Sequence, residues 1–177
     1  MRDSRGFTLV ELLLVILIVG ILMAISVTNY RQARLRGAEA AAISSLLAIN
    51  QAQFAYMHTC GNQKFAPKLS TLGKPHPGSN VAYLSPDLTG SDEVVKNGYR
   101  LVMEGEEATE PIQTCTGDTP VDAYHVTADP VAVGTTGNRF FGTNVTLVIY
   151  ESPESFSGRM PDTGAPTAGT EVTSTAR

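Results

Sequence analysis

The chain has 177 residues, 42% of them hydrophobic, and a formal net charge of −4. This length accommodates one globular domain with appendages and leaves little room for two separate cores. No run of Lys or Arg is long enough to follow a phosphate backbone, so the composition argues against nucleic acid as a direct partner.

The first predicted element is an apolar helix over residues 7–27, interrupted only by Thr8, Glu11 and Ser26. Such a helix extends about 31 Å, which matches the hydrocarbon core of one bilayer. A secretory signal peptide is the rival interpretation, because two arginines precede the run and "AIS" near its end is a passable cleavage sequence. The length of the run and the carboxylate of Glu11 count against it.

Glu11 is the one ionisable side chain of residues 7–29. A carboxylate in hydrocarbon costs several kcal/mol, so it usually marks a partner charge or an ion path. A partner for Glu11 must come from another chain, from a chain terminus or from lipid headgroups. The alternative is that Glu11, close to the start of the run, is protonated or reaches back to the interface.

Residues 6–23, "GFTLVELLLVILIVGILM", resemble the processing and assembly motif of type IV prepilins and type II secretion pseudopilins. Gly6, Phe7, Glu11 and Gly20, set in an otherwise apolar sequence, carry the resemblance. It implies that residues 1–6 are a cytoplasmic leader. A membrane-embedded prepilin peptidase would cut between Gly6 and Phe7 and then methylate the new amino group of Phe7.

The resemblance further implies that residues 7–28 form a transmembrane and assembly helix, in which Glu11 pairs with the amino group of Phe7 on a neighbouring copy. Filaments of this family grow at an inner-membrane assembly platform as homopolymers joined through this helix. Gly20 and Ala24 form a small-xxx-small pair that permits close helix packing. Most family members have proline where this chain has Thr28, so we expect Gly20 to be the flexible point.

The orientation of the chain involves a conflict. Arg31, Arg34 and Arg36 follow the apolar run, and a count of positive charges would place the following domain in the cytoplasm. The resemblance implies the opposite topology, with the leader inside and the body outside. We adopt it because a cytoplasmic peptidase site and a disulfide-capable body both require it.

An amphipathic helix is expected to continue over residues 29–60, because this stretch lacks proline and is rich in helix formers. Gly61 is the predicted stop. The apolar stripe is expected at four- and three-residue spacing, widened by Leu46: Ile43, Leu47, Asn50, Phe54 and Met57.

Residues 61–150 are predicted to form loops and an antiparallel sheet, with a short helical turn within 65–73. Extended segments are expected at 99–104, 123–128, 139–141 and 145–150. One face of that sheet needs a cover, and the amphipathic stripe supplies it. The expected fold is α+β and pilin-like, and the body sequence is also loosely similar to small bacterial pilin-like proteins.

Residues 151–177 are rich in Pro, Gly, Ser and Thr and are predicted to be a disordered tail on the filament surface.

The two cysteines, Cys60 and Cys115, do not form a CxxC pair. If the body lies outside the inner membrane, the simplest fate is a single disulfide, and free buried thiols are the alternative. Closing this loop would stabilise the fold by about 4 kcal/mol in the chain-entropy model.

Candidates for other chemistry are weak, so no cofactor, no metal and no enzymatic activity are predicted. The three histidines, His58, His76 and His125, lack metal-ligand spacing, and no nucleophile or phosphate-loop motif is present. Several acidic residues could suggest calcium but lack EF-hand spacing and are expected to be a solvated acidic surface. They are Asp92, Glu93, Glu104, Glu106, Glu107, Glu110 and Asp118.

The sequence therefore predicts a type IV pilus-like filament subunit, anchored by one pass in the inner membrane before assembly and at the cell surface afterwards. A type II secretion pseudopilin, forming a periplasmic piston, is the alternative within the same class. A membrane-anchored or secreted binding module that does not assemble is the alternative of another class.

Overall fold

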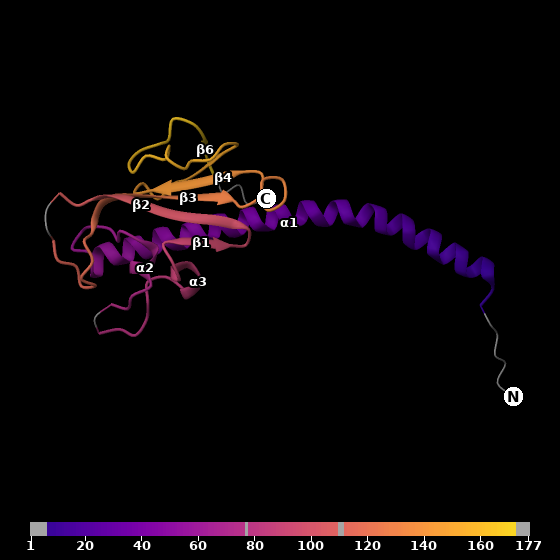
Figure 1. Cartoon of the computed structure of the whole chain (residues 1–177), viewed down its shortest axis with the longest axis horizontal. Helices are drawn as coiled ribbons and strands as arrows, with labels where there is room; N and C mark the ends of the chain where they lie inside the picture. Colours follow the sequence, from indigo (N-terminus) through magenta and orange to yellow (C-terminus); the bar gives the residue numbers. More distant parts are fainter. Residues whose placement is uncertain (1–6, 77, 110–111, 173–177) are drawn as a thin grey trace.

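The computed structural model describes residues 7–76, 78–109 and 112–172, apart from the side chains at 25, 27 and 28. One long helix packs on a six-stranded antiparallel sheet, which is the α+β arrangement that the sequence predicts (Figure 1). In chain order the elements are α1 (Leu9–Thr59), α2 (Leu69–Leu72), α3 (Pro86–Thr89), β1 (Glu93–Lys96), β2 (Tyr99–Glu107), β3 (Val121–Pro130), β4 (Phe140–Asn144), β5 (Ile149–Ser152) and β6 (Thr170–Glu171).

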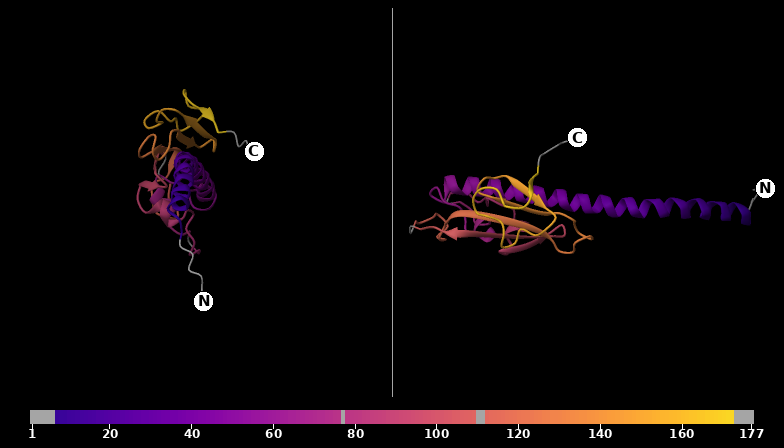
Figure 2. Two further views of the ribbon diagram at one scale, coloured as in Figure 1. Left: turned by 90° about the vertical axis from the view of Figure 1, so that its right-hand side faces the viewer. Right: turned by 90° about the horizontal axis from the view of Figure 1, so that it is seen from above.

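Helix α1 joins the two predicted helical segments without a break. The side chain of Thr8 caps its N-terminus, and it ends at Thr59, close to the predicted stop. A Cβ at Gly61 would collide with the Lys64 carbonyl oxygen and the Tyr56 ring, so the chain turns away where only glycine fits. The C-terminal half of α1 lies along the sheet, and the N-terminal half projects far beyond the domain (Figures 1 and 2).

The face that α1 buries agrees in part with the predicted stripe: Leu46 and Asn50 are buried as predicted, and Ile43 packs against the core. Leu47 and Phe54, both predicted to be buried, are 47% and 52% exposed. Fully or almost fully buried residues instead recur at 42, 46, 49, 53, 56 and 60. The predicted face and the buried face of α1 both carry apolar side chains. The face that packs on the sheet is the one that also buries Gln53 and Tyr56.

Hydrogen bonds between polar side chains hold this face of α1 in register with the sheet. The Asn50 amide donates to Thr143 Oγ1 at 2.9 Å, and the Tyr124 hydroxyl donates to Asn50 Oδ1 at 3.1 Å. Near the end of the domain from which α1 projects, the buried Glu39 carboxylate accepts from the Arg139 guanidinium at 2.7 and 2.9 Å. Such paired buried groups specify one orientation of the helix, because a rotated helix would leave them without partners.

The sheet is a meander in which β1 to β6 follow one another in chain order. Segments 99–104 and 123–128 are strands as predicted, and α2 is the expected short helical turn. Strand β1 was not predicted, although "NG" at Asn97 and Gly98, both at positive φ, is a strong hairpin signal. Residues 145–148 form a turn, with Leu147 at φ 63°, so the last predicted strand begins only at Ile149.

Residues 151–172 depart from the expected disordered tail. Strand β5 extends to Ser152, and β6 pairs with it, so the segment completes the sheet. Phe156 and Met160 are 3% and 5% exposed and pack with Tyr150 on the sheet face opposite α1. Few apolar residues are enough to order this segment, because they pack on a surface that the sheet already provides. Residues 173–177 lie outside the described part of the chain.

Candidate functional site

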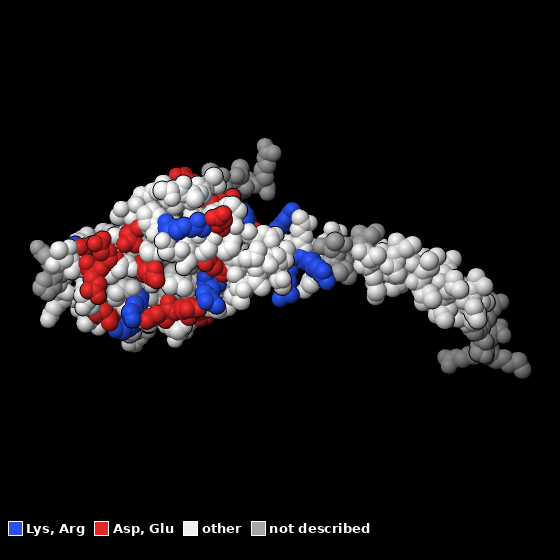
Figure 3. All heavy atoms as spheres, turned by 45° about the horizontal axis from the view of Figure 1, so that its top comes forward, with Lys and Arg blue, Asp and Glu red and all other residues white. Residues whose placement is uncertain are grey.

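The first part of α1, residues 9–24, projects beyond the domain. Every described side chain from 7 to 24 is exposed, and almost all are apolar (Figure 3). Among the described residues, α1 is the one helix long and apolar enough to cross a bilayer. Contact of this apolar surface with water is unfavourable, so the surface requires contact with lipid or with other protein.

Glu11 lies in the first turn of α1, where its backbone N–H donates to the Thr8 hydroxyl at 3.3 Å. A carboxylate there is favoured by the helix dipole. No cationic group of the described residues forms an ion pair with the Glu11 side chain. Phe7 precedes the helix and is 79% exposed, and Gly6 lies outside the described residues.

Gly20 and Ala24 lie one turn apart and line a shallow groove on the helix surface together with Leu13, Leu17 and Ile21. The groove exists because Gly20 has no side chain, and nothing lies within 4 Å of where its Cβ would be. Such a groove suits the close approach of another helix. Helical hydrogen bonding continues through residues 20 and 28 alike, so this structure has no break at either position.

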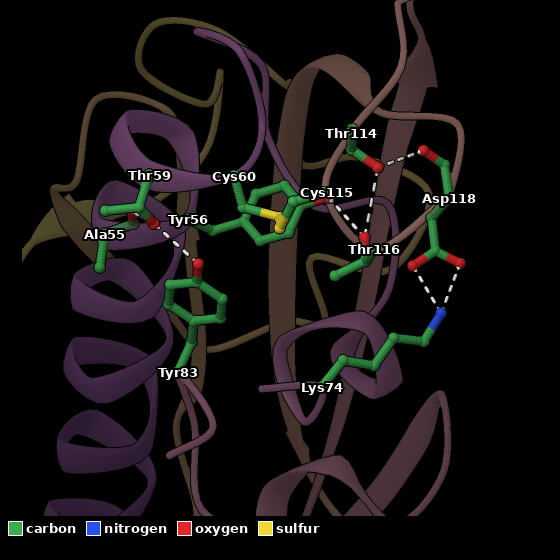
Figure 4. The surroundings of a disulfide bond; sticks show 10 residues. All are labelled: Ala55, Tyr56, Thr59, Cys60, Lys74, Tyr83, Thr114, Cys115, Thr116 and Asp118. Atoms are coloured by element: carbon green, nitrogen blue, oxygen red, sulfur yellow. Dashed lines mark hydrogen bonds and ion pairs between the residues drawn. A yellow bond between two sulfur atoms is a disulfide. The ribbon is translucent and has the colours of Figure 1, made fainter. Parts of the chain in front are cut away.

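The cysteines meet at the opposite end of the domain, where α1 terminates (Figure 4). Cys60 caps the helix and is joined by a disulfide to Cys115, which lies in the connection between β2 and β3, with the two Cα atoms 5.0 Å apart. The Cys115 N–H also donates to the Cys60 carbonyl oxygen at 3.2 Å, and the Tyr56 hydroxyl is 3.1 Å from Thr116 Oγ1. The bond ties this long connection to the end of α1.

The Asp118 carboxylate holds the same connection to the segment that follows α2, through the Lys74 ammonium at 2.6 Å. Partial burial raises the pKa of Asp118, but hydrogen bonds from Lys74 and Thr116 outweigh it and bring the pKa below its usual range. The carboxylate therefore stays charged in the folded protein.

The histidines are separated from one another. The His58 ring packs against Phe54 with ring centroids 4.5 Å apart. The His125 ring lies between two carboxylates, with Nδ1 at 2.5 Å from Asp162 and Nε2 at 3.3 Å from Glu104. Within the described residues, no three His, Cys, Asp or Glu side chains are grouped so that they could hold a metal ion.

Three of the seven acidic residues considered for calcium pair with a lysine or arginine of the chain, among them Asp118 with Lys74. Asp92 pairs with Lys68, and Glu93 pairs with Arg100. Glu110 lies outside the described residues.

Residues 1–27 match the family model of the prokaryotic N-terminal methylation motif. The match covers the residues before α1 and the exposed apolar part of α1, and it supports a protein of the type IV prepilin or pseudopilin class. Comparison with curated proteins gave no match, and neither did comparison with solved structures.

Proposed function

We propose that this chain is a subunit of a type IV pilus-like filament. Its precursor is inserted with the leader in the cytoplasm, cut between Gly6 and Phe7, methylated at Phe7 and polymerised through α1. The observation that carries this proposal is the coincidence of the methylation motif, residues 1–27, with the helix surface of residues 9–24, where every side chain is exposed and all but Glu11 are apolar or glycine. A helix that served only as an anchor would not need the motif.

The helix passes from lipid to the interior of a helical bundle, so apolar side chains stay out of water in both states. Close packing is supported by the groove at Gly20 and Ala24. In the bundle, the Glu11 carboxylate pairs with the amino group of Phe7 from a neighbouring copy. A copy displaced along the axis would leave both charges buried without partners, so the pair also selects the register.

Replacement of Glu11 by Gln tests this proposal. The variant should insert and be processed, while the yield of filaments sheared from cells falls at least about tenfold, since one buried charge loses its partner. Glu106→Gln is the matched control, because Glu106 is an exposed carboxylate on the domain. Normal filament yield from the Glu11 variant would refute the pairing.

Intact mass of the sheared material separates this proposal from a secreted binding module. A chain of residues 7–177 carrying one methyl group is expected, whereas a start near residue 25 or 27 would indicate a conventional signal peptide. A pseudopilin would share the motif and the uncovered helix. Loss of protein secretion on deletion, without surface filaments, would favour that alternative.

A further inference from the structure

The neck of the molecule, residues 28–36, joins the apolar half of α1 to the domain and carries three arginines: Arg31, Arg34 and Arg36. In the described part of the chain these three have no carboxylate partner. Every other described lysine or arginine forms an ion pair: Lys64, Lys68, Lys74, Lys96, Arg100, Arg139 and Arg159.

Figure 3 shows basic side chains gathered at the neck, between the apolar helix and an acidic domain. The protein has a net charge of −4, yet no carboxylate of the described residues forms an ion pair with the neck arginines. We therefore look for their partner outside the described residues.

The height of the neck above the membrane follows from helix geometry. If residues 7–27 span the hydrocarbon, Arg31 and Arg34 lie about 6 and 10 Å beyond it. The headgroup layer occupies about 5–8 Å on each side, and a long arginine side chain can reach back along the helix. Tyr30, 69% exposed, lies at the level where aromatic residues gather in membrane proteins.

The connection between β3 and β4 lies beside the same part of α1. It forms the end of the domain nearest the projecting helix (Figure 2, right). A cleft of about 750 Å³ separates the two, lined by Tyr30, Arg31 and Arg34 on the helix and by Gly134 and Thr135 on the connection.

The connection also presents two apolar side chains, Val131 and Val133, which are 51% and 63% exposed. It is held against α1 by the Glu39 carboxylate, which accepts from the Asn138 N–H at 3.0 Å and from Arg139. The cleft and the valines thus belong to one pre-formed end of the domain.

We propose that the neck is a phospholipid-binding surface in the membrane-anchored form. Arg31 and Arg34 hold a lipid phosphate in the cleft, Arg36 meets phosphates on the other side of the helix, and Val133 enters the headgroup layer. The ligand is the phosphate of anionic phospholipids in the leaflet that faces the domain. The inference rests on the proposed function in one respect, that α1 spans a bilayer before assembly.

Lipid is favoured over an acidic surface of a second copy for two reasons. The arginines closely follow the membrane-spanning run, so that their long side chains can reach back to the phosphates, and the exposed valines beside them suit a headgroup layer better than a carboxylate surface. Lipid phosphate also accounts for a basic cluster on the side of the membrane where the positive-inside pattern does not expect one.

A single tryptophan reports the contact, because the chain has none of its own. Val133→Trp is introduced into the full chain, which is reconstituted into vesicles of phosphatidylcholine with phosphatidylglycerol, with and without brominated acyl chains. Bromine quenching of the tryptophan is expected, with stronger quenching than in phosphatidylcholine alone and weaker quenching at high salt.

The neck variant combines Arg31→Gln, Arg34→Gln and Arg36→Gln, and its quenching should fall at least about threefold. The matched control combines Lys68→Gln, Arg100→Gln and Arg159→Gln, which removes the same charge from paired, exposed residues. The control should be quenched like the parent Val133→Trp chain.

Vesicle flotation distinguishes a failure of membrane anchoring from a failure of the lipid contact at the neck. A chain that does not float with vesicles would overturn membrane anchoring and this inference with it. A chain that floats while its tryptophan stays unquenched would overturn the lipid contact alone. Full quenching in the neck variant, with filament assembly lost, would assign the arginines to contacts between copies and also overturn it.

Discussion

Gln53 is the polar residue on which the packing of α1 against the domain depends most directly. Its side chain is 0% exposed and forms a two-way bridge to the backbone of Ala66. Nε2 donates to the Ala66 carbonyl oxygen at 2.9 Å, and the Ala66 N–H donates to Oε1 at 2.8 Å. The bridge fastens the segment after the helix to the face that α1 buries.

Gln53→Leu removes both hydrogen bonds and leaves the N–H and C=O of Ala66 buried without partners. Each such group costs about 1–3 kcal/mol, and the added apolar burial of leucine offsets part of the sum. We expect the free energy of unfolding to fall by about 2–4 kcal/mol. Gln51→Leu, an exposed position on the same helix, should change it by less than about 0.5 kcal/mol.

Urea unfolding of the full chain in detergent micelles, followed by circular dichroism, measures both variants under the same conditions. The prediction requires a lower midpoint for Gln53→Leu with an unchanged slope. If both variants lost the same amount, or if Gln53→Leu stayed within about 1 kcal/mol of the parent, the bridge would not be a determinant of this packing.

Two further predictions concern the far end of the domain. Replacing Cys60 and Cys115 by Ser should lower the free energy of unfolding by about 4 kcal/mol, and a loss below about 1 kcal/mol in the urea titration would contradict the loop-entropy argument. Because the pKa of Asp118 is lowered on folding, its contribution is present above the unfolded pKa, near 4, and is lost as the pH falls through the folded pKa. Lys74→Gln should cost at most about 1 kcal/mol at neutral pH and make the acid loss of stability shallower. Arg36→Gln should leave that acid profile unchanged in the same titrations.

Prediction of the body from sequence succeeded for the long helix and the central strands and only in part for the face of α1 that is buried. Helix formers without proline predict that α1 continues, but residues 43, 47 and 54 are as apolar as the stripe that is buried. The spacing of apolar residues shows which helix faces are apolar, but it does not show which side chains of the sheet and loops will pack against each face. Gln53 and Tyr56, which the predicted stripe did not include, shift the buried face because their partners come from loops distant in sequence.

The C-terminal segment illustrates a second reason for failure. Its composition is that of a disordered tail, and no local signal distinguishes Phe156 and Met160 from isolated apolar residues. They are buried because β4 presents Gly142, whose missing side chain leaves room for both. That surface exists only after the sheet has formed.

What the sequence alone determined is the N-terminal third: a bilayer-length helix, a carboxylate within its apolar run, and a methylation motif. These depend on local composition and spacing, which are fully present in the chain before it folds. Tertiary structure decided which helix face is buried, how the last strand docks, and which basic residues are left without a carboxylate. Those outcomes depend on pairs of residues distant in sequence, so only the folded chain reveals that the three neck arginines stand apart.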